Sequence, residues 1–228
     1  MPYNLSANTE EEWDAHIGIQ RPSPVGGAVK RGFDIVFSAV SLIALLPLFL
    51  IIALLLQIYG KGPVFFVHER VGFQGKTFKC LKFRTMIANA DARLEEMLSQ
   101  NAALRDEFER TRKLREDPRI IPVMGSFLRM SSLDELPQLM NVLLGSMSLV
   151  GPRPVTRIEF ERYGTAKREY QSTRPGLTGL WQVSGRNDLS FADRVAIDAN
   201  YVASWTLWRD LAIILKTFDV VYHRRGAY

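Results

Sequence analysis

The residues best suited to chemistry are two adjacent carboxylates, Asp134 and Glu135, in the apolar stretch SSLDELPQLMNVL. Ser132, three residues before Glu135, completes the pattern of a capping box, in which acids only start a helix and complement its dipole. Pro137 favours a different arrangement, because proline fits the first position of a helix and clashes in its interior. The acids would then precede the helix, beside backbone N–H groups that favour anions such as phosphate. The local pattern leaves both interpretations open.

Basic side chains in loops and at strand ends form a second candidate group. Arginine and lysine bind phosphate oxygens through charge-assisted hydrogen bonds, and Pro and Gly nearby give a stiff or closely packed backbone that positions them. We expect phosphate or substrate contacts from six such residues: Lys82, Arg84, Arg129, Arg153, Arg174 and Arg186.

The composition narrows the range of partners. The chain has 228 residues, a net charge of +5 and a pI near 9.4, which suits a membrane surface or nucleotide phosphates. We expect no nucleic-acid partner, because the sequence contains no known nucleic-acid-binding module. One cysteine, Cys80, excludes an intrachain disulfide, and His16, His68 and His223 do not have zinc-ligand spacing. The sequence also lacks a dinucleotide fingerprint and a P-loop.

A long apolar segment predicts membrane attachment. Residues Ile35 to Gly60 include no charged side chain and are numerous enough to cross a bilayer core. The segment begins too late and is too long for a signal peptide. Pro47 divides it into halves of about 12 residues, or about 18 Å each, which reach one leaflet. With basic residues on both flanks, this favours a re-entrant helix hairpin, broken at Pro47, with both ends in the cytoplasm. A straight span, with the flanks on opposite sides, is the alternative.

The remaining elements follow from periodicity and turn residues. Residues 64–83 predict two short strands joined by a Gly-containing turn. The charged stretch 89–116 predicts one amphipathic helix with a solvated face, and a dimer contact is its alternative role. Helices are also expected over 189–205 and 208–222. Aromatic and basic residues flank the last of these, which is typical of a helix at the membrane interface.

These elements predict a mostly helical α+β fold in three parts. Residues 1–29 would form a mobile cytoplasmic arm, and residues 30–60 the re-entrant membrane helix. Residues 61–228 would form a cytoplasmic catalytic domain at the membrane interface, with a short β-hairpin and interfacial amphipathic helices. The whole would be a monotopic membrane protein.

Several motifs occur in one order along the chain: KRGFD, KFRTM, LDELPQLMNVLLGSMSLVGPRP and RPGLTGLWQVSGRN. In this combination the chain resembles the bacterial sugar transferases, the small monotopic phosphoglycosyl transferases that start exopolysaccharide and O-antigen repeat units. The resemblance extends from about residue 30 to the C-terminus. It is strongest to the short exopolysaccharide enzymes that transfer galactose-1-phosphate, although no residue identifies the sugar, and glucose-1-phosphate is the other candidate.

The resemblance implies a reaction and a location. Members of this family transfer a sugar-1-phosphate from a UDP-sugar to undecaprenyl phosphate and release UMP. Because UDP-sugars are made in the cytoplasm, the catalytic domain would face the cytoplasm at the bacterial inner membrane. The family's membrane helix breaks at a Ser-Pro pair, whereas here Leu46 precedes Pro47.

The resemblance also assigns roles to the candidate residues. Asp134 would be a covalent nucleophile and Glu135 a ligand of Mg²⁺, which suits a carboxylate that attacks and a neighbour that holds a metal beside phosphates. Arg129 and Arg153 would contact phosphates, with Lys82 close by. Asp198 matches an acidic position of the family to which the motif assigns no role.

Two alternatives to this covalent enzyme are open. A membrane-anchored adaptor of a polysaccharide assembly complex would use the acid pair only as a helix cap. In a single-step enzyme, the lipid phosphate would attack directly and the carboxylates would only hold the metal.

Overall fold

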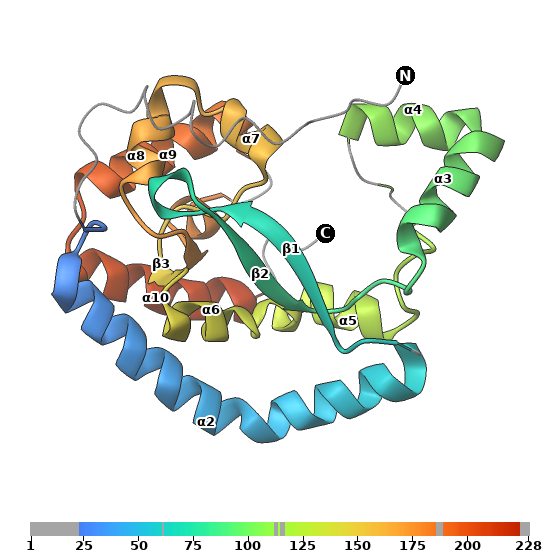
Figure 1. Ribbon diagram of the computed structural model, residues 1–228, viewed down its shortest axis with the longest axis horizontal. Helices are drawn as coiled ribbons and strands as arrows, with labels where there is room; N and C mark the ends of the chain where they lie inside the picture. The colour runs from blue at the N-terminus through green and yellow to red at the C-terminus, as the bar shows by residue number, and fades with distance from the viewer. Residues whose placement is uncertain (1–22, 61, 112–113, 115–116, 186–188, 224–228) are drawn as a thin grey trace.

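The computed structural model describes residues 23–60, 62–111, 114, 117–185 and 189–223 (Figure 1). Most of the predicted arm (1–29) and the predicted ligand Arg186 therefore lie outside the described residues. The helices are α2 (Gly27–Gly60), α3 (Ala90–Gln100), α4 (Ala102–Thr111), α5 (Met124–Met130), α6 (Gln138–Leu144), α7 (Arg157–Glu161), α8 (Lys167–Gln171), α9 (Phe191–Ala203) and α10 (Leu207–Tyr222). The strands are β1 (Phe65–Val71), β2 (Thr77–Phe83), β3 (Ser148–Val150) and β4 (Gly176–Thr178), and short 3-10 turns are η1 (Phe73–Gly75), η2 (Leu133–Glu135), η3 (Gly164–Ala166) and η4 (Trp181–Val183). The predicted mostly helical α+β class is confirmed.

The apolar segment forms one long helix, α2, which bows along one side of the molecule (Figure 1). Pro47 lies inside this helix. Because proline removes a backbone hydrogen bond and crowds the preceding turn, it accounts for a bend within a continuous helix. Of the residues in the most apolar 18-residue window of α2, 11% are buried, and the helix is long and apolar enough to cross a membrane. The two separate halves expected for a helix hairpin are not seen, because the helix continues through Pro47. Its re-entrant placement in a bilayer stays a prediction.

The N-terminal end of α2 is bonded to the rest of the protein. Arg31 donates to the carbonyl oxygens of Val142 and Leu143 at the end of α6, at 2.6 and 2.7 Å. Asp34 Oδ1 accepts from Ser148 Oγ at 3.0 Å and from the backbone N–H of the next residue at 2.9 Å. The KRGFD motif thus bonds α2 to α6 and β3, the two elements that follow the acid pair in sequence.

A buried ion pair adds a further link between α2 and α10. Lys30 is bonded to Asp210, and both side chains are almost fully buried. Tyr201 donates to the other oxygen of Asp210 at 2.7 Å, and Trp205 Nε1 donates to Oδ2 at 3.0 Å. A buried charge pair is tolerated when its remaining hydrogen-bonding capacity is satisfied in this way.

The predicted β-hairpin is confirmed. Strands β1 and β2 pair antiparallel, with Phe66 opposite Lys82 and His68 opposite Cys80. Asn141 of α6 holds the hairpin through two hydrogen bonds. Its side chain accepts one from the backbone of β2 at 2.9 Å and donates one to it at 2.8 Å. These contacts fix β2 relative to η2 and α6.

A parallel pair of short strands, β3 and β4, was not predicted. Their glycines allow close approach of the two backbones, since a Cβ on Gly176 would lie 2.1 Å from the backbone nitrogen of Gly151. Tyr170 of α8 holds the chain after β3 against β1, because its hydroxyl accepts from the N–H of Val155 at 3.2 Å and donates to the carbonyl of Val71 at 2.8 Å. This loop carries Arg153.

The charged stretch 89–116 does not form the single helix that we expected. It forms α3 and α4, separated by Asn101 in an extended conformation (φ −136°, ψ 106°). No residue of α3 is buried, and Figure 1 shows the two helices standing away from the rest of the fold. The helices expected over 189–205 and 208–222 are confirmed as α9 and α10.

Candidate functional site

The acid pair lies in η2, directly before α6. Ser132 has a left-handed backbone conformation (φ 57°), and its side chain makes no capping hydrogen bond. The capping-box interpretation is therefore wrong. Pro137 immediately precedes the first residue of α6, as its preference for a helix start predicts. Asp134 and Glu135 thus project from a turn that enters a helix.

Glu135 is held by two cations from different elements. Its Oε1 atom accepts from Lys82 Nζ of β2 at 2.7 Å and from Arg153 Nη2, after β3, at 3.1 Å. Burial alone would raise the pKa of this carboxyl, but the charges of Arg153 and Lys82 outweigh burial and lower the pKa to about 2. Glu135 is therefore a carboxylate at every physiological pH.

Asp134 has a different environment from its neighbour. None of the described residues donates a hydrogen bond to its carboxylate. Burial and then the negative charge of Glu135 raise the pKa of Asp134 to about 6. At pH 7 the group is mostly ionised, and it is more basic than an ordinary aspartate. An ionised carboxylate without bound donors retains the lone pairs that a nucleophile needs.

Both acids line a large open groove with a volume of ≈ 2600 Å³. One part of its wall is cationic and includes four of the six predicted ligands: Lys82, Arg84, Arg129 and Arg153. Another part is apolar and comes mainly from α2 and α10, including Phe37, Val40, Ala44, Ile214 and Phe218. The groove therefore has both a cationic and an apolar part.

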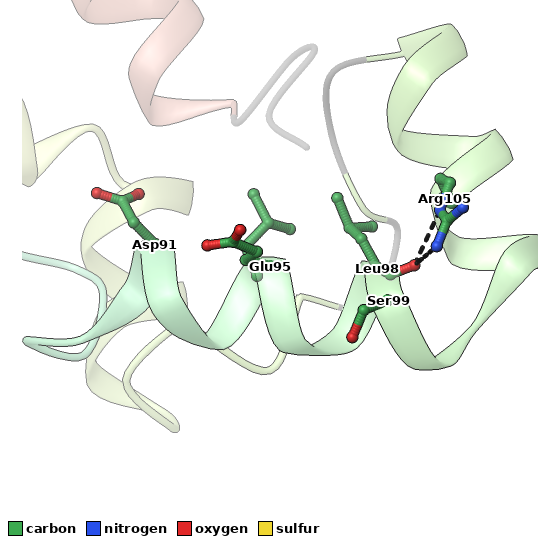
Figure 2. Close-up of a pocket in the computed structure, with 6 residues that line it drawn as sticks. Asp91, Glu95, Leu98, Ser99 and Arg105 are labelled. Atoms are coloured by element: carbon green, nitrogen blue, oxygen red, sulfur yellow. Dashed lines mark hydrogen bonds between the residues drawn. The ribbon is translucent and has the colours of Figure 1, made fainter. Parts of the chain in front are cut away.

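A second, smaller pocket of ≈ 360 Å³ lies between α3 and α4 (Figure 2). Arg105 closes one end of it by donating to the carbonyl oxygen of Leu98, at 3.0 and 2.8 Å. Among the described residues, Asp91 alone lines both this pocket and the large groove. None of the predicted site residues that the structure describes lines the small pocket, so the large groove is the candidate site.

Arg174 lies elsewhere. Its Nε donates to the carbonyl oxygen of Gly145 at 2.7 Å, beyond the end of α6 and close to Arg31. It is not among the described residues that line the groove. The structure therefore gives Arg174 a contact that supports the backbone and does not bring it to the acid pair.

Asp198 is also separate from the groove. It is buried on α9, where its Oδ2 accepts from the hydroxyl of Tyr163 at 3.0 Å. Burial raises the pKa of Asp198 to about 7. This position makes Asp198 part of the packing behind the loop that carries Arg153.

Arg84 lies at the rim of the groove with its guanidinium buried. Its Nη2 donates to the carbonyl oxygen of Gly60 at 2.8 Å, so it caps the C-terminal end of α2. Nε and Nη1 have no hydrogen-bond partner among the described residues. A Cβ on Gly62 would lie 2.3 Å from Nη1, so a larger residue there would require the Arg84 side chain to shift.

The groove also contains polar residues that were not predicted from the sequence. Asp117 and Arg119 form a two-point ion pair at 2.8 and 2.6 Å. Thr85 accepts a hydrogen bond from Arg129. His68 lies on β1, where burial and then the charge of Arg70 lower its pKa. Thr85 belongs to the motif KFRTM, so the sequence could have indicated that it lies at the site. Asp117, Arg119 and His68 lie in no such motif.

The donor set suits a metal that binds together with substrate. The described residues contain no cluster of three or more His, Cys, Asp or Glu side chains. Glu135 Oε2 and both oxygens of Asp134 make no hydrogen bond with the described residues. Mg²⁺ characteristically takes one or two protein carboxylates and completes its shell with phosphate oxygens and water. The acid pair fits such an ion.

Comparison with known proteins is consistent with this geometry. Residues 25–224 match the family model described as bacterial sugar transferase. The exopolysaccharide production protein ExoY of Sinorhizobium fredii (strain NBRC 101917 / NGR234) is 52% identical over 205 residues, which cover 90% of each chain.

Two further relatives have names that state a reaction. The undecaprenyl-phosphate galactose phosphotransferase of Salmonella typhimurium (strain LT2) is 50% identical over 88% of this chain and 42% of its own length. The undecaprenyl-phosphate glucose phosphotransferase of Komagataeibacter xylinus is 37% identical over 87% of this chain and 37% of its own length. The chain is thus similar to enzymes named for either sugar.

Proposed function

Because this chain belongs to the bacterial sugar transferase family, we propose that it transfers a sugar-1-phosphate from a UDP-sugar to undecaprenyl phosphate and releases UMP. Galactose-1-phosphate is our first choice of group, since the relative named for galactose is 50% identical and the one named for glucose 37%. The step would begin exopolysaccharide assembly, and the ExoY relative is named for exopolysaccharide production.

The observation that carries this proposal is that the two acids differ in their hydrogen bonds and in their pKa values. Glu135 is bonded to two cations, whereas Asp134 accepts no hydrogen bond from the described residues and has a raised pKa of about 6. An immobile carboxylate suits metal binding, and an unbonded, more basic one suits attack on phosphorus. A purely structural pair would not need this difference.

In the proposed first step, a carboxylate oxygen of Asp134 attacks the phosphorus atom that carries the sugar. A bond forms between that oxygen and phosphorus, while the bond from phosphorus to the UMP oxygen breaks. UMP leaves with the electron pair of that bond, and the enzyme retains an aspartyl phosphosugar. Lys82, Arg129 and Arg153 would stabilise the negative charge that develops on the phosphate oxygens.

In the second step, a phosphate oxygen of the lipid attacks the same phosphorus atom. The bond to Asp134 breaks, the free carboxylate returns, and the product is a lipid diphosphate sugar. A bound Mg²⁺ would supply neutralisation of the donor's diphosphate charge, with Glu135 as its main protein ligand. The protein's own cations hold Glu135 ionised for that purpose.

The shape of the groove supports a lipid phosphate as acceptor. Apolar residues of α2 and α10 line the same groove as Asp134 and its neighbouring cations. A hydrocarbon chain on the apolar part would bring its phosphate head group to the cationic part. A soluble acceptor would not need an apolar wall of this extent.

Contacts at both ends of α2 support the re-entrant, monotopic arrangement. Arg31 bonds the N-terminal part of the helix to α6, and Arg84 bonds its last residue, Gly60, to the end of β2. Both ends therefore join the same catalytic domain, which a straight span would not allow. We accordingly propose residues 30–60 as the membrane element and residues 61–228 as a catalytic domain on the cytoplasmic side of the bacterial inner membrane.

The outer face of the protein is suited to a lipid surface. Exposed apolar side chains occur on α2, α5, α6 and α10: Val36, Ile43, Leu46, Leu50, Leu54, Phe127, Met130, Met140, Leu144, Leu215 and Phe218. Together with the net charge of +5, they fit an anionic membrane.

The test is release of UMP by detergent-purified protein supplied with undecaprenyl phosphate and Mg²⁺. UDP-galactose, UDP-glucose and their N-acetyl forms serve as alternative donors, and the Asp134→Asn variant serves as the inactive control. We expect release that depends on lipid, metal and Asp134, with the preferred donor naming the sugar. Absence of release with every donor, from folded protein, would contradict the proposed function and favour an adaptor.

A further inference from the structure

Arg129 is a cation of the groove that, unlike Lys82 and Arg153, has no salt bridge to Glu135. It lies on α5, its residue is exposed, and it forms no ion pair with a described carboxylate. A free arginine side chain has about 2 kcal/mol of rotamer entropy, which must be lost whenever the guanidinium is fixed on a phosphate. A contact that orients the side chain before substrate binds would reduce this cost.

One hydrogen bond supplies that orientation. Arg129 Nε donates to Thr85 Oγ1 at 2.8 Å. Thr85 follows the end of β2 and is 7% exposed, so the acceptor is itself immobile. Because the bond uses Nε, the two terminal nitrogens of the guanidinium stay available to the groove. Those nitrogens form the edge of the guanidinium that can bind two oxygens of a phosphate.

The backbone around Thr85 is built to keep α5 close. The carbonyl oxygen of Thr85 accepts from the N–H of Ile121 at 2.9 Å. A Cβ on Gly125 would lie only 2.4 Å from that same oxygen, so glycine is required for this approach. Arg129 follows Gly125 by four residues and therefore lies on the same face of the helix, one turn further along. The close approach at Gly125 thus brings Arg129 over the Thr85 hydroxyl.

We propose that Thr85 is a positioning residue that fixes the guanidinium of Arg129 for contact with the donor's diphosphate. Thr85 does not touch the reacting atoms and acts only through Arg129. The inference rests on the proposed function for its substrate, but the contact between the two side chains can be tested without turnover. It gives the threonine of the KFRTM motif a role of its own, beside Lys82, which holds Glu135.

The first test is a double-mutant cycle on the kcat/KM for the UDP-sugar. Thr85→Val keeps the shape of the side chain but removes the acceptor, and we expect a loss of about tenfold, as for a charge-assisted hydrogen bond. Thr85→Ser keeps the hydroxyl and should remain within about threefold of wild type. In an Arg129→Met background, Thr85→Val should have no further effect, because the group that it positions is gone. Equal losses in both backgrounds would overturn the proposal, as would a Thr85→Ser variant no better than Thr85→Val.

The second test measures the contact directly. Solvent exchange of the Arg129 Nε proton, followed by NMR on purified protein without substrate, should be about tenfold or more faster in Thr85→Val than in wild type. Equal exchange rates in the two proteins would overturn the proposal. If wild-type protein released no UMP with any donor, the proposed function would fail, while the exchange rates would still decide whether Thr85 holds Arg129.

Discussion

Two neighbouring carboxylates differ in character because their partners differ. The charges of Arg153 and Lys82 overcome burial and lower the pKa of Glu135 to about 2, whereas burial and Glu135 raise the pKa of Asp134 to about 6. Separate pKa values within a pair of acids are a frequent sign of separate chemical roles. The difference is the one that our proposal requires, with Glu135 as a metal ligand and Asp134 as the nucleophile.

Removing one of the two cations should expose this dependence. In Lys82→Met, Glu135 keeps only Arg153, so we expect kcat/KM for UMP release to fall about tenfold or more and the Mg²⁺ requirement to rise. Lys79→Met is the matched control, since Lys79 is on the same strand but is exposed and pairs across from Glu69. Equal activity of the two variants over a Mg²⁺ titration would contradict the role assigned to Lys82.

Asp198 makes a prediction about stability and pH. Burial raises its pKa from 3.8 to about 7, so the folded protein binds a proton there more tightly than the unfolded chain does. Its favourable contribution is fully present below pH 3.8 and is lost as the pH rises through about 7. The loss is about 4 kcal/mol at 1.36 kcal/mol per pKa unit.

The Asp198→Asn variant is neutral at every pH and still offers an oxygen to Tyr163. We therefore expect its Tm to exceed that of wild type by several degrees at pH 8 and to match it near pH 4. Asp106→Asn, at an exposed position on α4, should leave the Tm unchanged at both pH values. A lower Tm for Asp198→Asn at pH 8 would show that the ionised form of Asp198 stabilises the fold.

At the scale of elements, the sequence predicts those parts whose signal is local. The hairpin of β1 and β2 has strand-forming residues and a glycine turn, and α9 and α10 have long helical periodicity. Strands β3 and β4 have three residues each, too few for a periodic pattern, and they pair only because distant glycines meet. Asn101 separates α3 from α4 although the charge pattern continues across it.

The same limit applies to the site. The acid pair and four of the predicted cations lie in one groove, and they could be singled out because their residue types are unusual in their local sequence. Arg174, which caps the end of α6, and Lys30, which pairs with Asp210 at a separation of 180 residues, resemble any basic residue in sequence. Their partners are set by tertiary packing, which no local pattern reports.

Gly125 provides a test of how closely α5 packs against the backbone of Thr85. A Cβ there would lie 2.4 Å from the carbonyl oxygen of Thr85 and 2.9 Å from Ile120 Cγ2, so α5 would have to move away. We expect Gly125→Ala to lower both the Tm and the kcat/KM for UMP release, because Arg129 moves with the helix. Gly32→Ala is the control, since a Cβ at that helical position meets nothing within 4 Å and should keep or raise the Tm. Full activity in Gly125→Ala would contradict the claim that close packing of α5 at Gly125 positions Arg129.

At the scale of the whole molecule, α2 is attached to one catalytic domain at both ends. The attachments are the hydrogen bonds of Arg31 and Asp34 at one end and of Arg84 to Gly60 at the other. A helix of this length could cross a bilayer only if one set of these contacts were broken. These contacts are consistent with the proposed one-sided insertion, which would keep the groove at the lipid surface.

Thiol labelling tests this one-sided insertion. Ser23 precedes α2 in the sequence and Gln100 follows it, and both positions are exposed. Single cysteines introduced there report on the two flanks of the helix. In sealed spheroplasts, an impermeant maleimide should label neither residue, and it should label both after the membrane is opened. The parent protein should stay unlabelled, since its native thiol, Cys80, is buried. Labelling of one position only in sealed spheroplasts would contradict re-entrant insertion.

The central claim is that Asp134 forms a covalent bond to the transferred group. The most direct measurement is the intact mass of the purified protein after incubation with Mg²⁺ and UDP-sugar in the absence of lipid. We predict a mass increase of one phosphosugar on the wild type, located at Asp134 by peptide analysis, reversed when undecaprenyl phosphate is added, and absent in Asp134→Asn. UMP release that requires lipid from the outset, with no adduct on wild-type protein, would contradict the covalent route and indicate direct attack by the lipid phosphate.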